Sequence, residues 1–166
     1  MAAAILNSVT NGARVIALPF GVLGGPGDAR VMAALQYGHD RDVVFTAAAP
    51  QNGTSDWPNL THLLQVNHGK MDGTINHGYT AVGDSLILAP GRNLVAQGVY
   101  YGGNSDACGI AAGCVAILRE HRPDLNASEI VTLLRRTADD AGQTRRINLL
   151  AALQTEGRRF LDVEQE

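Results

Sequence analysis

A chain of 166 residues is long enough for one domain with a core, and 45% of its residues are hydrophobic, as in ordinary globular proteins. Its formal net charge of -3, from 13 basic and 16 acidic residues, excludes a strongly basic surface, so we expect no nucleic-acid partner. The N-terminus has neither a basic region nor a long apolar run. We therefore expect no signal peptide and no membrane span.

The first fifty residues alternate apolar helices and strands. We expect a helix over residues 2–8, a buried strand over 13–18 that ends at Pro19, a helix over 29–37 capped by Asp28, and a second buried strand over 42–49 that ends at Pro50. The glycine-rich segment 21–27 is expected to be a loop.

The rest of the chain continues this alternation. Short strands are expected over residues 63–66 and 85–88, and helices after Ser105, over 127–137 and over 147–153. Asn126 and Glu129 have the spacing of a capping box at the start of the second helix. Because the strands are continuous apolar runs between helices, the sequence predicts an α/β fold with a mostly parallel sheet covered on both faces.

Two cysteines, Cys108 and Cys114, fall on different sides of the helix expected after Ser105. They are therefore expected to be unpaired, which favours a reducing, cytoplasmic location. His68 and His77 frame a glycine-rich loop that contains Asp72, but this spacing is a weak signal for metal ligands. We expect them to be surface loop histidines, and we expect no metal site and no cofactor.

Residues 103–118 join a Gly-x-Ser turn to a helix of small and apolar residues. A hydroxyl at the first turn of a buried helix lies among unpaired N–H groups and at the positive end of the helix dipole, both of which stabilise an oxyanion. The same pattern also fits a helix cap packed against a core. Ser105 is thus a candidate nucleophile, with a purely structural role as the alternative.

Five segments follow one another along the chain: residues 13–21, 42–49, 79–83, 88–91 and 103–107. Read in this order, they resemble the second half of a subtilisin-like serine protease domain. Closing segments over 122–130 and 147–153 resemble the last helices of such domains. The resemblance covers residues 1–153 and implies a three-layer α/β/α fold. Residues 154–166 are polar and are expected to form a tail after this domain.

The resemblance also implies roles for individual residues. Ser105 falls at the nucleophile position. Gln51 matches the asparagine that donates to the oxyanion, and Asn52 takes that place if the loop shifts by one residue. A peptide substrate would pair with the segment after the first strand. The positions that match the substrate-binding segments are Leu18, Pro19, Phe20, Gly21, Ala48 and Pro50.

This chain departs from the family pattern around Ser105. Asn104 stands where the family has Thr, and Asp106 where it has a small or apolar residue; an acidic neighbour disfavours negative charge in a transition state. Gly109 stands where the family has a proline. Pro19 also has no N–H to donate to a substrate strand.

A Ser-His-Asp mechanism needs a base and a carboxylate, which in this family precede the matched segments. The sequence therefore leaves several functions open. The chain is part of a subtilisin-like serine peptidase that takes its Asp and His from a partner chain or a processed upstream segment and is inactive alone, or it is a pseudoprotease that binds peptides or acts as a scaffolding subunit. A third alternative is an α/β domain that binds a small anion beside Ser105, against which Asp106 counts.

Overall fold

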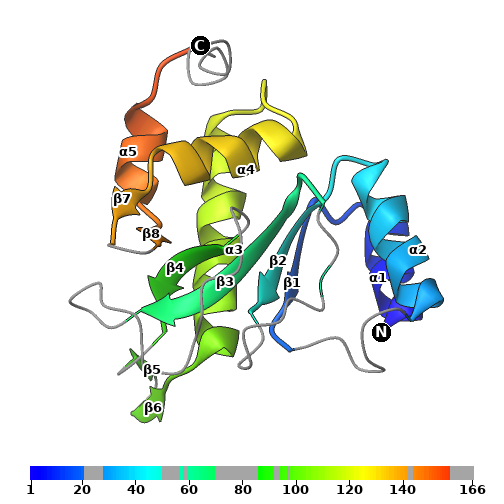
Figure 1. The fold of residues 1–166 in the computed structure, drawn as a ribbon. Helices are drawn as coiled ribbons and strands as arrows, with labels where there is room; N and C mark the ends of the chain where they lie inside the picture. Colours follow the sequence, from blue (N-terminus) through cyan, green and yellow to red (C-terminus); the bar gives the residue numbers. More distant parts are fainter. Residues whose placement is uncertain are drawn as a thin grey trace.

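The computed structural model describes residues 1–20, 28–49, 57, 60–69, 86–91, 94–96, 98–141 and 144–157. Within these ranges helices and strands alternate along most of the chain (Figure 1). The helices are α1 (Ala2–Thr10), α2 (Ala29–His39), α3 (Asn104–His121), α4 (Ala127–Arg136) and α5 (Leu149–Gln154). The strands are β1 (Val15–Leu18), β2 (Val44–Ala48), β3 (Leu63–Gly69), β4 (Leu86–Pro90), β5 (Leu94–Ala96), β6 (Val99–Tyr101), β7 (Asp139–Asp140) and β8 (Arg145–Arg146).

The main sheet has the strand order β1-β2-β3-β4-β8-β7. The pairs from β1 to β4 are parallel, as is the pair of β4 with β8, and only β7 with β8 is antiparallel among the described strands of this sheet. Both β2 and β3 are buried along their whole length. The predicted mostly parallel sheet is therefore confirmed, and β5 with β6 forms a separate antiparallel pair.

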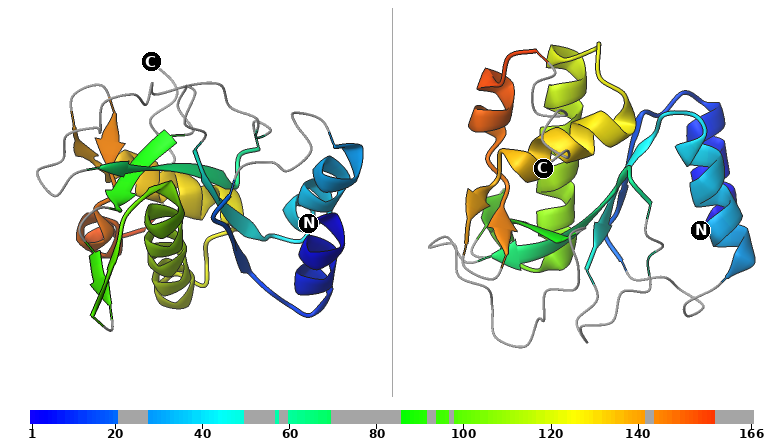
Figure 2. Two further views of the ribbon diagram at one scale, coloured as in Figure 1. Left: turned by 90° about the horizontal axis from the view of Figure 1, so that it is seen from below. Right: turned by 45° about the horizontal axis from the view of Figure 1, so that its top comes forward.

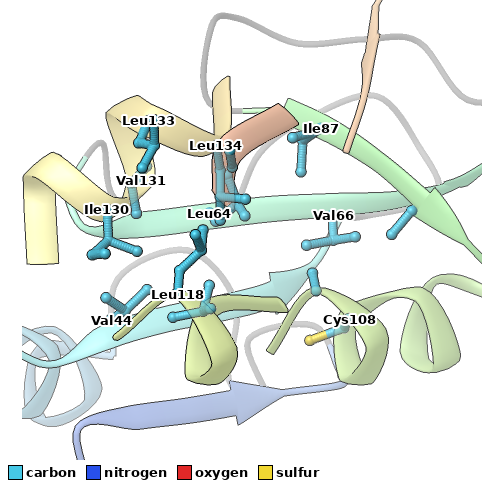
Figure 3. Packing of buried hydrophobic residues seen from close by; sticks show 14 of the residues in the cluster. Val44, Leu64, Val66, Ile87, Cys108, Leu118, Ile130, Val131, Leu133 and Leu134 are labelled. Atoms are coloured by element: carbon cyan, nitrogen blue, oxygen red, sulfur yellow. The ribbon is translucent and has the colours of Figure 1, made fainter. Parts of the chain in front are cut away.

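Alternate residues of the central strands pack into two separate clusters, as expected for a sheet covered on both faces. Val44, Leu64 and Val66 pack with α3 and α4, as Figure 3 shows. Phe45 and Leu63 pack with α1 and α2 instead. Two further views show α3, α4 and α5 apart from α1 and α2, so the predicted three-layer α/β/α arrangement is confirmed (Figure 2).

Local sequence signals set several element boundaries. The Asp28 side chain accepts a hydrogen bond from the backbone of Arg30 at the start of α2, and Asn126 and Glu129 form the predicted capping box of α4. The helix α2 runs two residues further than the sequence predicted, and β3 extends to Gly69 because it pairs with β4 as far as Pro90. The short strands β5 to β8 were not predicted.

The predicted unpaired state of both cysteines is confirmed. Cys108 is buried and Cys114 half-buried, and burial raises the pKa of each thiol. The Cys108 Sγ and backbone exchange hydrogen bonds with Thr46 of β2, which fixes α3 on the sheet. None of the described helices is long and apolar enough to cross a membrane.

Candidate functional site

The N-terminus of α3 lies at the carboxyl ends of four parallel strands. Its first residues, together with Gly103, form hydrogen bonds to one strand end after another. Their partners are Pro19 after β1, Ala49 after β2, His68 near the end of β3 and Gly91 after β4. Open α/β sheets bind ligands at this end of their strands, so the fold itself favours a functional site here.

Asn104, the first residue of α3, connects the helix to β2 and β3. Its Nδ2 donates to the carbonyl oxygen of Ala49 at 2.7 Å, and its Oδ1 accepts from the backbone N–H of His68 at 2.9 Å. The Nδ1 of His68 lies 2.6 Å from the same oxygen. Because an amide oxygen only accepts, this ring nitrogen carries the proton. Asn104 is buried, so these bonds replace those that water would make.

A close backbone approach holds the start of α3 against β4. A Cβ atom at Gly91 would lie 2.5 Å from the Cβ of His68, 2.7 Å from the carbonyl oxygen of Gly103 and 2.9 Å from the Cβ of Ala107. None of these atoms is the end of a flexible side chain, so only glycine fits at this position. The N–H of Gly103 donates to the carbonyl oxygen of Gly91 across this contact.

Ser105 is the second residue of α3, and its side chain is exposed. The Oγ atom donates a hydrogen bond to the carbonyl oxygen of Pro19 at 2.6 Å. Backbone N–H groups of the first helical turn have no acceptor inside the helix, and the helix dipole is positive at this end. The surroundings of Ser105 therefore favour an oxyanion beside its hydroxyl, although Asp106 in the same turn opposes this.

Solved protease structures share this architecture. No protein-family model and no curated protein matches the chain. The prenylagaramide maturation protease PagA superposes with a TM-score of 0.78 at 22% identity, over 92% of this chain and 66% of its own. A mutant of the PatA protease domain superposes with a TM-score of 0.78 at 25% identity, over 91% of this chain and 62% of its own. MycP1 with its N-terminal propeptide removed superposes with a TM-score of 0.75 at 20% identity, over 93% of this chain and 66% of its own.

The chain has a divergent subtilisin-like fold. It spans 62–66% of the length of these three subtilisin-like proteases. The TM-scores support a shared fold, and at identities of 20–25% the chemistry of this chain has to be argued from its own residues.

In this subtilisin-like fold, the predicted substrate-binding residues that the structure describes lie at the ends of β1 and β2. Leu18 ends β1 and is buried, Phe20 follows Pro19 with 41% of its surface exposed, and Ala48 ends β2 and is buried. Pro19 contacts Ser105 directly through its carbonyl oxygen. The remaining predicted positions, both oxyanion candidates among them, lie outside the described residues: Gly21, Pro50, Gln51 and Asn52.

The structure corrects the expectation for His68. This residue is not in a surface loop: it lies in β3 and is 5% exposed. The reason is that β3 continues past Val66 by pairing with β4, which the polar sequence of residues 67–69 does not indicate. His77 and Asp72 lie outside the described residues. Among the residues that the structure does describe, no three His, Cys, Asp or Glu side chains are placed to hold a metal ion.

A second polar cluster, which sequence reasoning missed, secures the far end of α3. Arg119 has a side chain that is 5% exposed and donates to the carboxylate of Asp42. The same carboxylate accepts from the backbone N–H of Ala127 at the start of α4 and from Arg14. Partial burial acts to raise the pKa of Asp42, but the hydrogen bonds from Arg119 and Ala127 outweigh it and hold the pKa below its usual value. Both ends of α3 are thus fixed to the sheet by buried polar side chains.

Proposed function

We propose that this chain is part of a subtilisin-like serine peptidase domain in which Ser105 is at the nucleophile position. The Asp and His of the triad come from a partner chain or an upstream segment, and the chain is inactive alone. The observation that carries the proposal is the placement of an exposed serine hydroxyl at the start of α3, at the carboxyl ends of the parallel strands.

The hydrogen bonding of Ser105 supports the need for a base from elsewhere. A serine nucleophile must transfer its proton to a base as it attacks. Within the part of the chain that the structure describes, the Ser105 hydroxyl donates to the Pro19 carbonyl, an acceptor that cannot take up the proton at neutral pH. A base that reaches Ser105 must displace this contact.

The edge strand β1 supports a protein partner. Among the described strands β1 pairs with β2 alone, and Val15, Ile16 and Ala17 are half-buried or exposed. An apolar edge strand exposes unpaired backbone groups and favours addition of another strand. A partner that adds a strand here would lie beside Pro19, and therefore beside Ser105.

Small residues on the outer side of α3 support the same partner. Gly109 and Gly113 are exposed, and a Cβ atom at either position would meet no atom within 4 Å apart from the backbone of its own helix. Each glycine costs an exposed helix about 1 kcal/mol relative to alanine. They follow Ser105 at steps of four residues, about one and two helical turns away, so all three residues lie along one side of the helix. A partner segment packed against the two glycines would therefore reach the serine.

A pseudoprotease that binds peptides or acts as a scaffold is the second candidate. It is favoured by Asn104, whose side chain serves to hold the helix start, and by Asp106 in the first turn. In that case Ser105 is a helix-start residue bonded to Pro19 and has no nucleophilic role.

Labelling with a fluorophosphonate probe tests the proposal. In such labelling the Oγ of an activated serine attacks phosphorus, fluoride leaves, and the serine proton passes to the base. We expect the isolated chain to label no faster than its Ser105→Ala variant. Co-expression with the neighbouring reading frames, followed by purification of any complex, should give labelling that peptide mass spectrometry assigns to Ser105.

The result distinguishes the two candidates. Labelling that appears in the complex and is lost in Ser105→Ala supports the peptidase. A stable, monomeric chain that associates with no co-expressed product and never labels would contradict it and support the pseudoprotease.

Alanine at Gly113 should stabilise the isolated chain. Helix propensity predicts a gain of up to about 1 kcal/mol for Gly113→Ala, since the added methyl group meets no other atom. Urea unfolding measures the gain. Gly91→Ala is the matched control and should destabilise, because its Cβ would meet backbone and core atoms. A loss of stability in Gly113→Ala would show that this side of α3 is not open.

A further inference from the structure

A cavity lies at the opposite end of the sheet from Ser105, where α2, β3 and α4 meet. It has a volume of about 280 Å³ and is lined by His39, Asp40, Asp42, His62 and residues 126–128. Figure 1 shows the elements that carry the lining residues: the start of β3 lies at the top of that strand, between α4 and α2. The proposed function assigns no role to this region.

His62 is the unusual residue of this cavity. It directly precedes β3, is 1% exposed, and neither ring nitrogen has a hydrogen-bond partner in the described part of the chain. Its ring packs edge-on against His39, with 4.2 Å between centroids, and against Phe45 of β2, with 5.7 Å. A buried, unpartnered imidazole is tolerated only in its neutral form, because the charged form loses its hydration without compensation.

We propose that this junction is an acid-sensitive latch: protonation of His62 withdraws its ring from between His39 and Phe45 and loosens the packing of the end of α2 and the start of α4 around the cavity. The protonated ring has two N–H donors that both need acceptors. Since the closed packing offers no acceptor to either donor, the ring has to turn into the cavity to reach water and carboxylates.

The charges around His62 favour this outward movement. The end of α2 contributes His39 and Asp40, which bond to each other at 3.2 Å, and the turn before β2 contributes Asp42. The carboxylate of Asp42 is already bonded to Arg119, Arg14 and the backbone of α4. The Phe45 ring and residues 126–128 are uncharged, and Glu129 of α4 caps the backbone of Asn126. Asp40, which is exposed, is therefore the carboxylate toward which a charged His62 would move.

The direction of the pH effect follows from the pKa of the His62 imidazole. Burial, and then the positive charge of His39, lower the pKa of His62 from 6.5 to about 4, against the opposing effect of Asp40 and Asp42. The open state, with an ordinary pKa, binds protons more readily than the closed state. The latch is fully closed above pH 6.5 and weakens as the pH falls toward 4. Between pH 7 and pH 5 the opening equilibrium should rise about 20-fold.

Hydrogen exchange on the 166-residue chain tests the latch. Peptides that cover the end of α2 and the start of α4 should show the rise in opening at pH 5, after correction for the intrinsic pH dependence of exchange. Amides in the middle of β2 and β3 open only on global unfolding, which also frees His62, so they should share the relative rise but keep a much smaller opening equilibrium than the ends of α2 and α4. Opening equilibria at the α2 and α4 ends that are no larger than those of the strands at pH 5, or the absence of any rise at these ends, would overturn the proposal.

Two variants assign the effect to one histidine. His62→Gln keeps a neutral polar side chain that does not titrate and should abolish the pH dependence of opening, whereas His39→Gln should leave most of it. A full pH response in His62→Gln overturns the latch. If that variant does not fold, an NMR titration of the wild-type His62 ring decides instead: a midpoint near 4 supports the latch and one near 6.5 overturns it.

Discussion

Replacing Asn104 by alanine should lower the free energy of unfolding by about 3 kcal/mol, because it removes several buried hydrogen bonds at once. The substitution takes the acceptor from the backbone N–H and the Nδ1 of His68, and the donor from the carbonyl oxygen of Ala49. Each buried polar group that loses its partner costs about 1–3 kcal/mol, and water that enters the site recovers part of this. Urea unfolding measures the loss.

The neighbouring residue provides a matched control. Ser105→Ala removes one hydrogen bond from an exposed side chain and should cost less than about 1 kcal/mol. Asn104→Asp keeps an acceptor for His68 but places an oxygen against the carbonyl of Ala49, so it should cost about as much as alanine. Equal, small effects at both positions would show that Asn104 does not hold the helix start.

The order of helices and strands could be predicted from the sequence because it depends on local patterns. The continuous apolar run of β2 and the spacing of Asn126 and Glu129 are visible within a few residues. The mostly parallel, doubly covered sheet follows from the alternation of such segments. The two-residue strands β7 and β8 were missed because they consist of Asp and Arg residues, which have no apolar pattern.

The candidate site could be predicted only in part, because its contacts join residues far apart in the sequence. The sequence indicated Ser105 by its place at the start of a small-residue helix. It presented Asn104 as a mere departure from the family pattern, whereas the structure connects this side chain to residues 36 and 55 positions away. Arg119 and Asp42 are 77 positions apart, and each alone resembles an ordinary surface charge.

The second large effect on stability is expected at the Asp42 cluster, in which this carboxylate accepts from Arg119, Arg14 and the backbone N–H of Ala127. Asp42→Ala should lower the free energy of unfolding by about 3 kcal/mol, because it leaves the guanidinium of Arg119 buried without its counter-charge. The start of α4 also loses the carboxylate that accepts from Ala127. The estimate lies at the low end for a buried pair, since Asp42 itself is 41% exposed and water can replace part of its contribution.

Three comparisons isolate the charge of Asp42 from its shape. Asp42→Asn keeps the side-chain oxygen and tolerates the backbone φ of 60° at this position, so it should cost less than alanine. Asp40→Ala removes a more exposed carboxylate two positions away and should change stability little.

The pH dependence gives the third comparison. Because its pKa is lowered, Asp42 contributes stability above pH 3.8 that is lost as the pH falls further, whereas His62 acts between pH 6.5 and 4. Asp42→Asn should therefore flatten the acid limb below pH 4 and leave the loss between pH 6.5 and 4 in place. If the variant instead removes the loss between pH 6.5 and 4, the acid response of this junction belongs to the Asp42 cluster and not to His62.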